Sequence, residues 1–439
     1  MNLRTAVQRA LRSMLLASLC GLAVPAMADD PVPAAEPVKP LPLEELRLFA
    51  EVYDRIKNAY VEPVDDAKLL QDAVRGMLAG LDPHSNYMDA EEFEALQVHT
   101  SGEFGGLGIE VGMEEPYIRV ITPIDDTPAQ RAGVKAGDLI SQLDDKPVAS
   151  MTLEEAINLM RGEPGEPIEL TILREGHDTP LKIKVVRDVI HVASVKSRML
   201  EPGFGYLRIT QFQVNTGKEL AKQLESLMQE NELRGLVLDL RNNPGGVLQA
   251  AVDVSNAFLS EGTIVYTEGR LPNSDQLFEA NSQTVASDLS VVVLINGGSA
   301  SASEIVAGAL QDQKRAIIMG TDSFGKGSVQ TILPLAKDRA IKLTTARYFT
   351  PNGRSIQAQG IEPDIEVANA ELKPLEGGQS HLKERDLSGH LENGNGQGGD
   401  NATVKEARAE EQALLREDFQ LFEALSLLKA LSIVKLQDK

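Results

Sequence analysis

GLVLDLRNNPGG, residues 235–246, is the stretch from which the fold can be worked out. Its first half is an apolar run typical of a buried strand, and its second half is a turn with paired glycines. A second apolar run, FGYLRITQF at 204–212, precedes it, and a third, VVVLIN at 291–296, follows it. Helical stretches lie between these runs, at 217–229 and 248–259. Strands alternating with helices on this spacing predict an α/β core with a largely parallel sheet and packed helices.

Residues 98–190 differ from this core in pattern. The glycine-punctuated run HTSGEFGGLGIEVGM opens them, and alternation typical of strands follows, interrupted by helical patches near 128–134 and 152–160. The pattern predicts a β-rich domain inserted before the core, which we place at 191–370. Upstream, in 43–97, apolar residues recur at the i, i+3, i+4 spacing of an amphipathic helix, so we expect an N-terminal helical region.

The C-terminal part is predicted to be a tether followed by a helix. Residues 371–405 are Gly-rich and polar, which is typical of a flexible linker. Residues 406–439 are predicted to be helical, and their apolar positions cover too much of the circumference for a solvated helix. We therefore expect this helix to bury its surface against another subunit or an adaptor. The alternative is that it packs back on its own core.

The first 28 residues have the pattern of a secretory signal peptide. Three arginines precede an apolar stretch, and Ala26-Met27-Ala28 provides an A-x-A cleavage site. A Pro-rich leader, 29–42, follows. A membrane anchor is the alternative, but the apolar stretch is short for a span of about 20 residues. Because the single cysteine, Cys20, lies in this segment, its removal excludes a disulfide framework, a cysteine zinc site and a cysteine nucleophile.

Composition argues against nucleic acid as a partner. The 439 residues carry a formal net charge of -22, aromatic residues make up 4%, and tryptophan is absent. Nucleic-acid binding needs a basic surface and often stacking rings. A chain of this length can also bury a sizeable core without cross-links.

A candidate nucleophile lies in NGGSASASEIVAGAL, residues 296–310, where an apolar strand ends and a helix begins. Ser301 falls at this turn. A helix N-terminus offers free N–H groups and a positive dipole end, which can hold the oxyanion formed when serine attacks a carbonyl. The alternative is purely structural, since Ser301 and Glu304 also match the S-x-x-E capping box that starts many helices.

A serine nucleophile needs a general base, and the sequence favours a lysine over a histidine for this role. None of the six histidines falls between 192 and 380, the region that carries the serines. Lys326, in TDSFGKGSVQ, lies between two apolar strands and can serve as a base if burial lowers its pKa. It can also be an ordinary loop lysine. A phosphate-binding loop is a further alternative, but Gly327 stands where that loop needs Ser or Thr.

Four motifs together resemble the carboxyl-terminal processing, or tail-specific, proteases, which are serine peptidases with a Ser-Lys dyad. The resemblance covers residues 43–367. The motifs occur in the family's order: GLVLDLRNNPGG, then NGGSASASEIVAGALQD, then GTDSFGKGSVQ, then TPNGRSIQAQGIEPDI.

The resemblance implies a role for each matching residue. Ser301, the middle serine of SASAS, corresponds to the nucleophile, and Lys326 corresponds to the general base. Gln330 matches the glutamine that orients the lysine. The backbone N–H groups of Ala302 and Gly246 would form the oxyanion hole. The dyad uses no metal and no cofactor, so we expect neither.

The inserted domain, 98–190, resembles the PDZ domain of this family. Its GGLGI run corresponds to the loop that binds the terminal carboxylate of a peptide while the peptide adds a strand to the sheet edge. The residues of this loop are Gly105, Gly106, Leu107, Gly108 and Ile109.

The sequence thus predicts a periplasmic serine endopeptidase that recognises the C-terminal tails of its substrates through a PDZ domain. The resemblance makes envelope proteins, including peptidoglycan hydrolases, plausible substrates and an adaptor lipoprotein a plausible partner. We expect a homo-oligomer assembled through the terminal helices. The competing class is a peptide-binding scaffold: a PDZ domain on an inactive core.

Overall fold

The computed structural model describes residues 41–230, 232–370, 384, 387–391 and 414–437. Four of the sequence-based predictions therefore lie wholly or largely outside the described residues. They are the signal peptide 1–28, most of the leader 29–42, most of the linker 371–405, and the first part of the helix predicted at 406–439.

The chain divides into two compact units, with the boundary between Asp72 and Ala73. The first unit holds α2 (Leu43–Ala59) and the beginning of α3 (Asp66–Ala79). No residue of α2 is buried, and its apolar residues are exposed although they follow helical spacing. A salt bridge of 2.7 Å joins Lys57 to Asp66 within this unit.

The second unit contains the core sheet, which has six strands. In spatial order they are β10 (Val195–Glu201), β11 (Phe204–Ile209), β12 (Gly235–Asp239), β15 (Ser290–Ile295), β16 (Ile317–Gly320) and β19 (Ile365–Glu366). Strands β11 to β19 run parallel, and only β10 pairs antiparallel. The predicted α/β class with a largely parallel sheet is confirmed.

Both faces of the core sheet are covered, because successive side chains of a strand point to opposite faces. Leu236, Leu238 and Val293 belong to one core cluster with the helices α7 (Thr216–Glu230), α8 (Leu248–Asn256) and α9 (Ala302–Asp312). Their neighbours Val237 and Val292 belong to a second cluster on the opposite face. The crossover helices therefore cover one face, and something else must cover the other.

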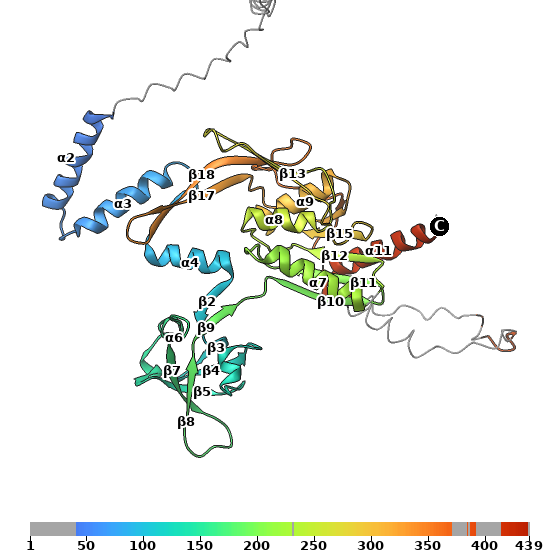
Figure 1. Ribbon diagram of the computed structural model, residues 1–439, viewed down its shortest axis with the longest axis horizontal. Helices are drawn as coiled ribbons and strands as arrows, with labels where there is room; N and C mark the ends of the chain where they lie inside the picture. Colours follow the sequence, from blue (N-terminus) through green and yellow to red (C-terminus); the bar gives the residue numbers. More distant parts are fainter. Residues whose placement is uncertain (1–40, 231, 371–383, 385–386, 392–413, 438–439) are drawn as a thin grey trace, which may run out of the picture. The chain divides into compact units, whose positions relative to one another are not determined.

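The C-terminal helix α11 (Phe419–Gln437) covers that second face and lies beside β12 and β15 (Figure 1). Its buried apolar residues are Leu421, Ala424, Leu425 and Leu428. The expectation that this apolar surface is buried by another subunit or an adaptor needs correction, because the chain's own sheet buries it. Assembly of the whole protein stays a prediction.

A second, antiparallel sheet flanks the core. Its strands are β1 (Asn86–Met88), β13 (Thr263–Gly269), β14 (Gln276–Glu279), β17 (Ser328–Leu335) and β18 (Arg339–Phe349). Strand β1 precedes the inserted domain in sequence, yet it pairs with β18, far along the chain. Between β1 and the inserted domain, α4 (Ala90–Ser101) is capped by Asp89 and Glu92. The sequence predicts the strand β17 but not β1, β13, β14 or α4.

The inserted domain is an antiparallel sheet with short helices, as predicted. Its strands are β3 (Ile109–Glu114), β4 (Tyr117–Pro123), β5 (Leu139–Leu143), β6 (Lys146–Pro147), β7 (Pro167–Leu173) and β8 (Leu181–Val186). Its helices are α5 (Pro128–Arg131), the 3-10 turn η1 (Val148–Ser150) and α6 (Leu153–Met160). The chain enters and leaves this domain through the paired strands β2 (Glu103–Gly106) and β9 (Asp188–His191).

Candidate active site

Three turns meet at the carboxyl ends of β12, β15 and β16. They carry the paired glycines, the serine cluster and the candidate lysine, respectively. Carboxyl ends of parallel strands lie at one edge of a sheet, and this edge is where open α/β sheets place their ligands. The three motifs that sequence reasoning treats separately are thus one site.

Ser301 occupies a strained position between β15 and α9. Its φ is +56°, a value that a residue with a side chain rarely adopts. It is only partly buried, whereas every residue of α9 from Ala302 to Leu310 is buried. Its backbone N–H donates to the Glu304 carboxylate at 2.7 Å. The turn therefore holds the Ser301 hydroxyl at the surface of a rigid helix end.

Glu304 joins the serine turn to the lysine loop. It is fully buried and accepts hydrogen bonds from the Ser323 hydroxyl (2.6 Å) and from the N–H groups of Gly325 (2.7 Å) and Lys326 (2.9 Å). Burial raises its pKa, although these donors and the Ser301 N–H act in the opposite direction. The S-x-x-E pattern suggests only a helix cap. The structure shows that the same carboxylate also holds the candidate base loop.

The paired glycines press the β12 turn against the serine. At Gly245, where φ is +97°, a Cβ would lie 2.6 Å from the Ala300 carbonyl oxygen and 2.8 Å from the Ser301 Cβ. The Asn243 carbonyl oxygen accepts the Ala300 N–H at 3.0 Å. Only a residue without a side chain permits this approach.

Two backbone amides remain unused at this junction. Gly245 donates its N–H to the side chain of Asn243 at 2.9 Å. Within the described residues, no hydrogen bond uses the N–H of Gly246 or of Ala302, the first residue of α9. These are the two amides that the resemblance implies as oxyanion donors, and that role stays a prediction.

Lys326 lies half-buried in the loop after β16. Burial lowers the pKa of its amine, and the charge of Lys342 lowers it further, whereas Glu304 and Asp82 raise it; the net shift is downward. Among the described residues, no hydrogen bond holds the Nζ atom. A lysine in this state is a better base near neutral pH than one in water.

Gln330 lies on β17, four residues after Lys326, and in the described part of the chain no hydrogen bond joins its side chain to the Lys326 amine. Its side-chain amide donates to the hydroxyl of Ser328 at 2.9 Å and to that of Thr344 at 3.4 Å. The orienting role that the resemblance implies is therefore not realised in this structure and stays a prediction.

Sequence reasoning misses Tyr348. This tyrosine on β18 is buried, and its hydroxyl donates to the Lys326 carbonyl oxygen. Burial raises the pKa of Tyr348, as does the charge of Glu304, while a hydrogen bond with the Ser301 side chain lowers it. Tyr348 therefore contacts both candidate catalytic residues. It stands two residues before the TPNGRS motif, and this position is the only signal of its role in the sequence.

The loop before β1 is a second missed contributor. Asp82 accepts hydrogen bonds from the Ser85 hydroxyl (2.7 Å) and the Thr344 hydroxyl (3.1 Å). Burial lowers the pKa of His84, and the charge of Lys326 lowers it as well. A histidine thus lies near the site, although sequence reasoning looks for one only between 192 and 380. Nothing within 82–85 signals this, because the contact arises through the β1–β18 pairing.

The candidate tail-binding loop adjoins an open sheet edge. Gly105 and Gly106 lie in β2, Leu107 is buried, and Ile109 begins β3. Strand β3 pairs with β4 alone in its sheet, within the described residues. A glycine-rich turn beside a free strand edge is the arrangement that strand addition requires.

The described residues include no group of three or more His, Cys, Asp and Glu side chains placed to hold a metal ion. Among the helices of the same residues, none is long and apolar enough to cross a membrane.

Three family models match the chain. They are "Peptidase family S41" over 203–367, "PDZ domain" over 105–185, and "Activating protease CtpB N-terminal domain" over 25–92. The first covers strands β11 to β19 of the core sheet and all three turns of the site.

Curated relatives agree with these models. A "Carboxy-terminal-processing protease" of Bartonella bacilliformis is 52% identical over 351 residues, which is 79% of this chain and 81% of that protein. A "Probable CtpA-like serine protease" of Staphylococcus epidermidis is 36% identical, over 75% of this chain and 67% of that protein. A solved structure, "Photosystem II D1 C-terminal processing protease", is 31% identical and covers 74% of this chain and 93% of its own, with a TM-score of 0.42. The chain therefore belongs to peptidase family S41, as a serine peptidase of the carboxy-terminal processing type with a PDZ domain.

Proposed function

We propose that this chain is exported to the periplasm and cleaves envelope proteins whose C-terminal tails its PDZ domain binds, with Ser301 as nucleophile and Lys326 as general base. One observation carries the assignment of the dyad. The Glu304 carboxylate accepts the backbone N–H groups of both Ser301 and Lys326, so it fixes the two residues relative to each other.

The proposed reaction is acyl transfer. The neutral Lys326 amine takes the hydroxyl proton of Ser301 as its oxygen attacks a peptide carbonyl. The unused N–H groups of Gly246 and Ala302 stabilise the negative oxygen of the tetrahedral intermediate. The leaving amine takes this proton from Lys326 and departs, and water then hydrolyses the acyl-enzyme.

Export and substrate class rest on sequence. The pattern of residues 1–28 supports export, and an uncut leader would leave the protein on the membrane. The family resemblance supports envelope substrates such as peptidoglycan hydrolases and an adaptor lipoprotein as partner. The exposed apolar residues of α2 support assembly through the N-terminal part of the predicted terminal helices. The open edge of β3 beside Gly105–Ile109 supports tail binding.

The test is cleavage of an unfolded reporter with an apolar C-terminal tail, followed by mass spectrometry. We expect Ser301→Ala and Lys326→Ala to abolish cleavage, because each removes one member of the dyad. Ser287→Ala and Lys337→Ala are matched controls at exposed positions and should cleave like the wild type.

Substantial turnover by Lys326→Ala would refute the dyad. If neither the wild type nor the variants cleave, even with envelope extract added, the chain is a scaffold rather than an active peptidase. Cleavage that does not depend on the tail sequence would refute tail recognition.

A further inference from the structure

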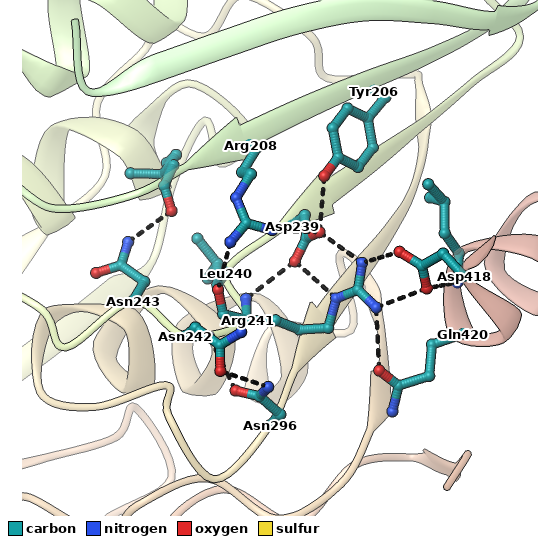
Figure 2. A network of polar contacts seen from close by, with 12 residues as sticks. Tyr206, Arg208, Asp239, Leu240, Arg241, Asn242, Asn243, Asn296, Asp418 and Gln420 are labelled. Carbon is teal, nitrogen blue, oxygen red and sulfur yellow. Dashed lines mark hydrogen bonds and ion pairs between the residues drawn. The ribbon is translucent and has the colours of Figure 1, made fainter. Parts of the chain in front are cut away.

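The side chain of Arg241 is enclosed by carboxylates and an amide from two distant parts of the chain (Figure 2). On one side, its Nε and Nη2 donate to Asp239 at 3.0 and 2.7 Å. On the other, its Nη1 and Nη2 donate to Asp418 at 2.8 and 2.7 Å. Its Nη1 also donates to the Gln420 side chain at 3.1 Å. All five N–H groups of the guanidinium are thus used.

The centre of this network is buried, and its charges balance. Asp239 is fully buried and Arg241 is 8% exposed. Arg208 adds a second positive charge to Asp239 at 3.2 Å, so two arginines face two aspartates. Removing one partner from such a network leaves an uncompensated charge, which is costly at a buried position.

Arg241 is also the first residue of the RNNPGG turn. Its own N–H donates to Asp239 at 2.9 Å, and its carbonyl oxygen accepts from Arg208 at 3.3 Å. The next residue, Asn242, has a φ of +56° and exchanges hydrogen bonds with Asn296 at 2.9 and 3.0 Å. Arg241 therefore connects the ion-pair network to the first residues of the turn that leads to Gly246.

The opposite half of the network belongs to the C-terminal helix. Asp418 precedes α11 and accepts the N–H of Leu421 at 3.0 Å, while Gln420 donates to the Val367 carbonyl oxygen at 2.7 Å. The apolar face of α11 packs on the core sheet. Asp418 is therefore held rigidly, with both carboxylate oxygens directed at Arg241.

We propose that Asp418 is a positioning residue for catalysis: through Arg241 it holds the 241–246 turn in the shape that presents the Gly246 N–H to the oxyanion. The proposal rests on the oxyanion role proposed for Gly246. It makes the C-terminal helix part of the catalytic apparatus, although α11 touches neither Ser301 nor Lys326 in any hydrogen bond of the described residues.

The test compares Asp418→Asn with Glu201→Gln in the full-length mature protein. Glu201, on the edge strand β10, forms an ion pair with Lys429 of α11 at 2.8 Å. For Asp418→Asn we expect kcat to fall about tenfold or more with KM unchanged, since small misplacements of catalytic groups have effects of this order. We expect faster amide hydrogen exchange in 240–247. Asp418→Glu, which keeps the charge, should restore part of kcat.

Glu201→Gln should lower the melting temperature without changing kcat or exchange in 240–247. Equal losses of kcat in both variants would mean that helix docking matters only for stability, which overturns the proposal. Unchanged exchange in Asp418→Asn would also overturn it. If the wild type itself cleaves nothing, the proposed function fails, and the exchange measurement still decides whether Asp418 positions the turn.

Discussion

Burial lowers the pKa of the candidate base, Lys326, and neighbouring residues of opposite charge adjust it further. Lys342 lowers the pKa of Lys326, and Asp82 raises it. Only the neutral amine can accept the Ser301 proton, so kcat/KM should rise with pH through the pKa of Lys326. Because the folded protein lowers this pKa, the rise should come below the ordinary value for lysine.

Substitutions at these neighbours should move that rise in opposite directions. Lys342→Gln removes a repelling charge, so the pKa of Lys326 increases and the rise moves to higher pH. Asp82→Asn removes an attracting charge, so the rise moves to lower pH. The pH profile of kcat/KM measures both shifts, and Lys337→Gln, in the exposed β17–β18 turn, is the control. Shifts of the same sign in both variants would contradict the assignment of Lys326 as base.

The sequence predicts the parts of the site that a local motif encodes. Ser301 and Lys326 stand in turns recognisable by their glycines and flanking apolar strands. Glu304 is visible only as a cap, because its other partners come from a loop about 20 residues away. Asp82 and Tyr348 depend on strand pairing across the inserted domain, and pairing over such distances leaves no periodic signal in one sequence.

At the level of the element, the apolar pattern of α11 correctly predicts that the helix is buried. From the sequence we expect another subunit or an adaptor to bury it, whereas the chain's own sheet does so. Its apolar positions do require burial, as predicted. The core strands indicate where the helix packs. VVVLIN is apolar at every position but the last, which is typical of a strand buried on both faces. The crossover helices cover one face, so the other needs a further layer, and α11 supplies it.

Substitution of Leu428 tests how much the packing of α11 on the sheet contributes to the free energy of unfolding. Its side chain is fully buried against Gly235. Leu428→Ala should lower the free energy of unfolding by about 2–5 kcal/mol, because it leaves a cavity in a packed layer. Ile433→Ala, on the exposed side of the same helix, should change it by less than about 0.5 kcal/mol. Denaturant titration gives both values, and equal effects would mean that α11 does not dock on the sheet in solution.

At the level of the whole molecule, the exposed apolar residues of α2 are the remaining argument for assembly. Leu46, Phe49, Val52 and Ile56 share helical spacing, and all are exposed. Phe49→Glu should reduce the mass measured by light scattering to that of one chain, without changing the melting temperature, because α2 contributes no buried residue. Arg47→Gln makes the same change in net charge and should leave the mass unaltered. A wild type that already has the mass of one chain would contradict this prediction.

The contacts that build the site join residues that are far apart in the sequence and are therefore synthesised at different times. The Ser85 hydroxyl donates to Asp82 and accepts the N–H of Thr344, which lies 259 positions later in the chain. Arg241 pairs with Asp418, which lies 177 positions later. A chain synthesised from its amino end can form the Ser85–Thr344 contact only once β18 has been made, and the Arg241–Asp418 contact only once Asp418 has been made. A partly synthesised chain that ends before Asp418 therefore contains both candidate dyad residues but lacks the carboxylate that pairs with Arg241.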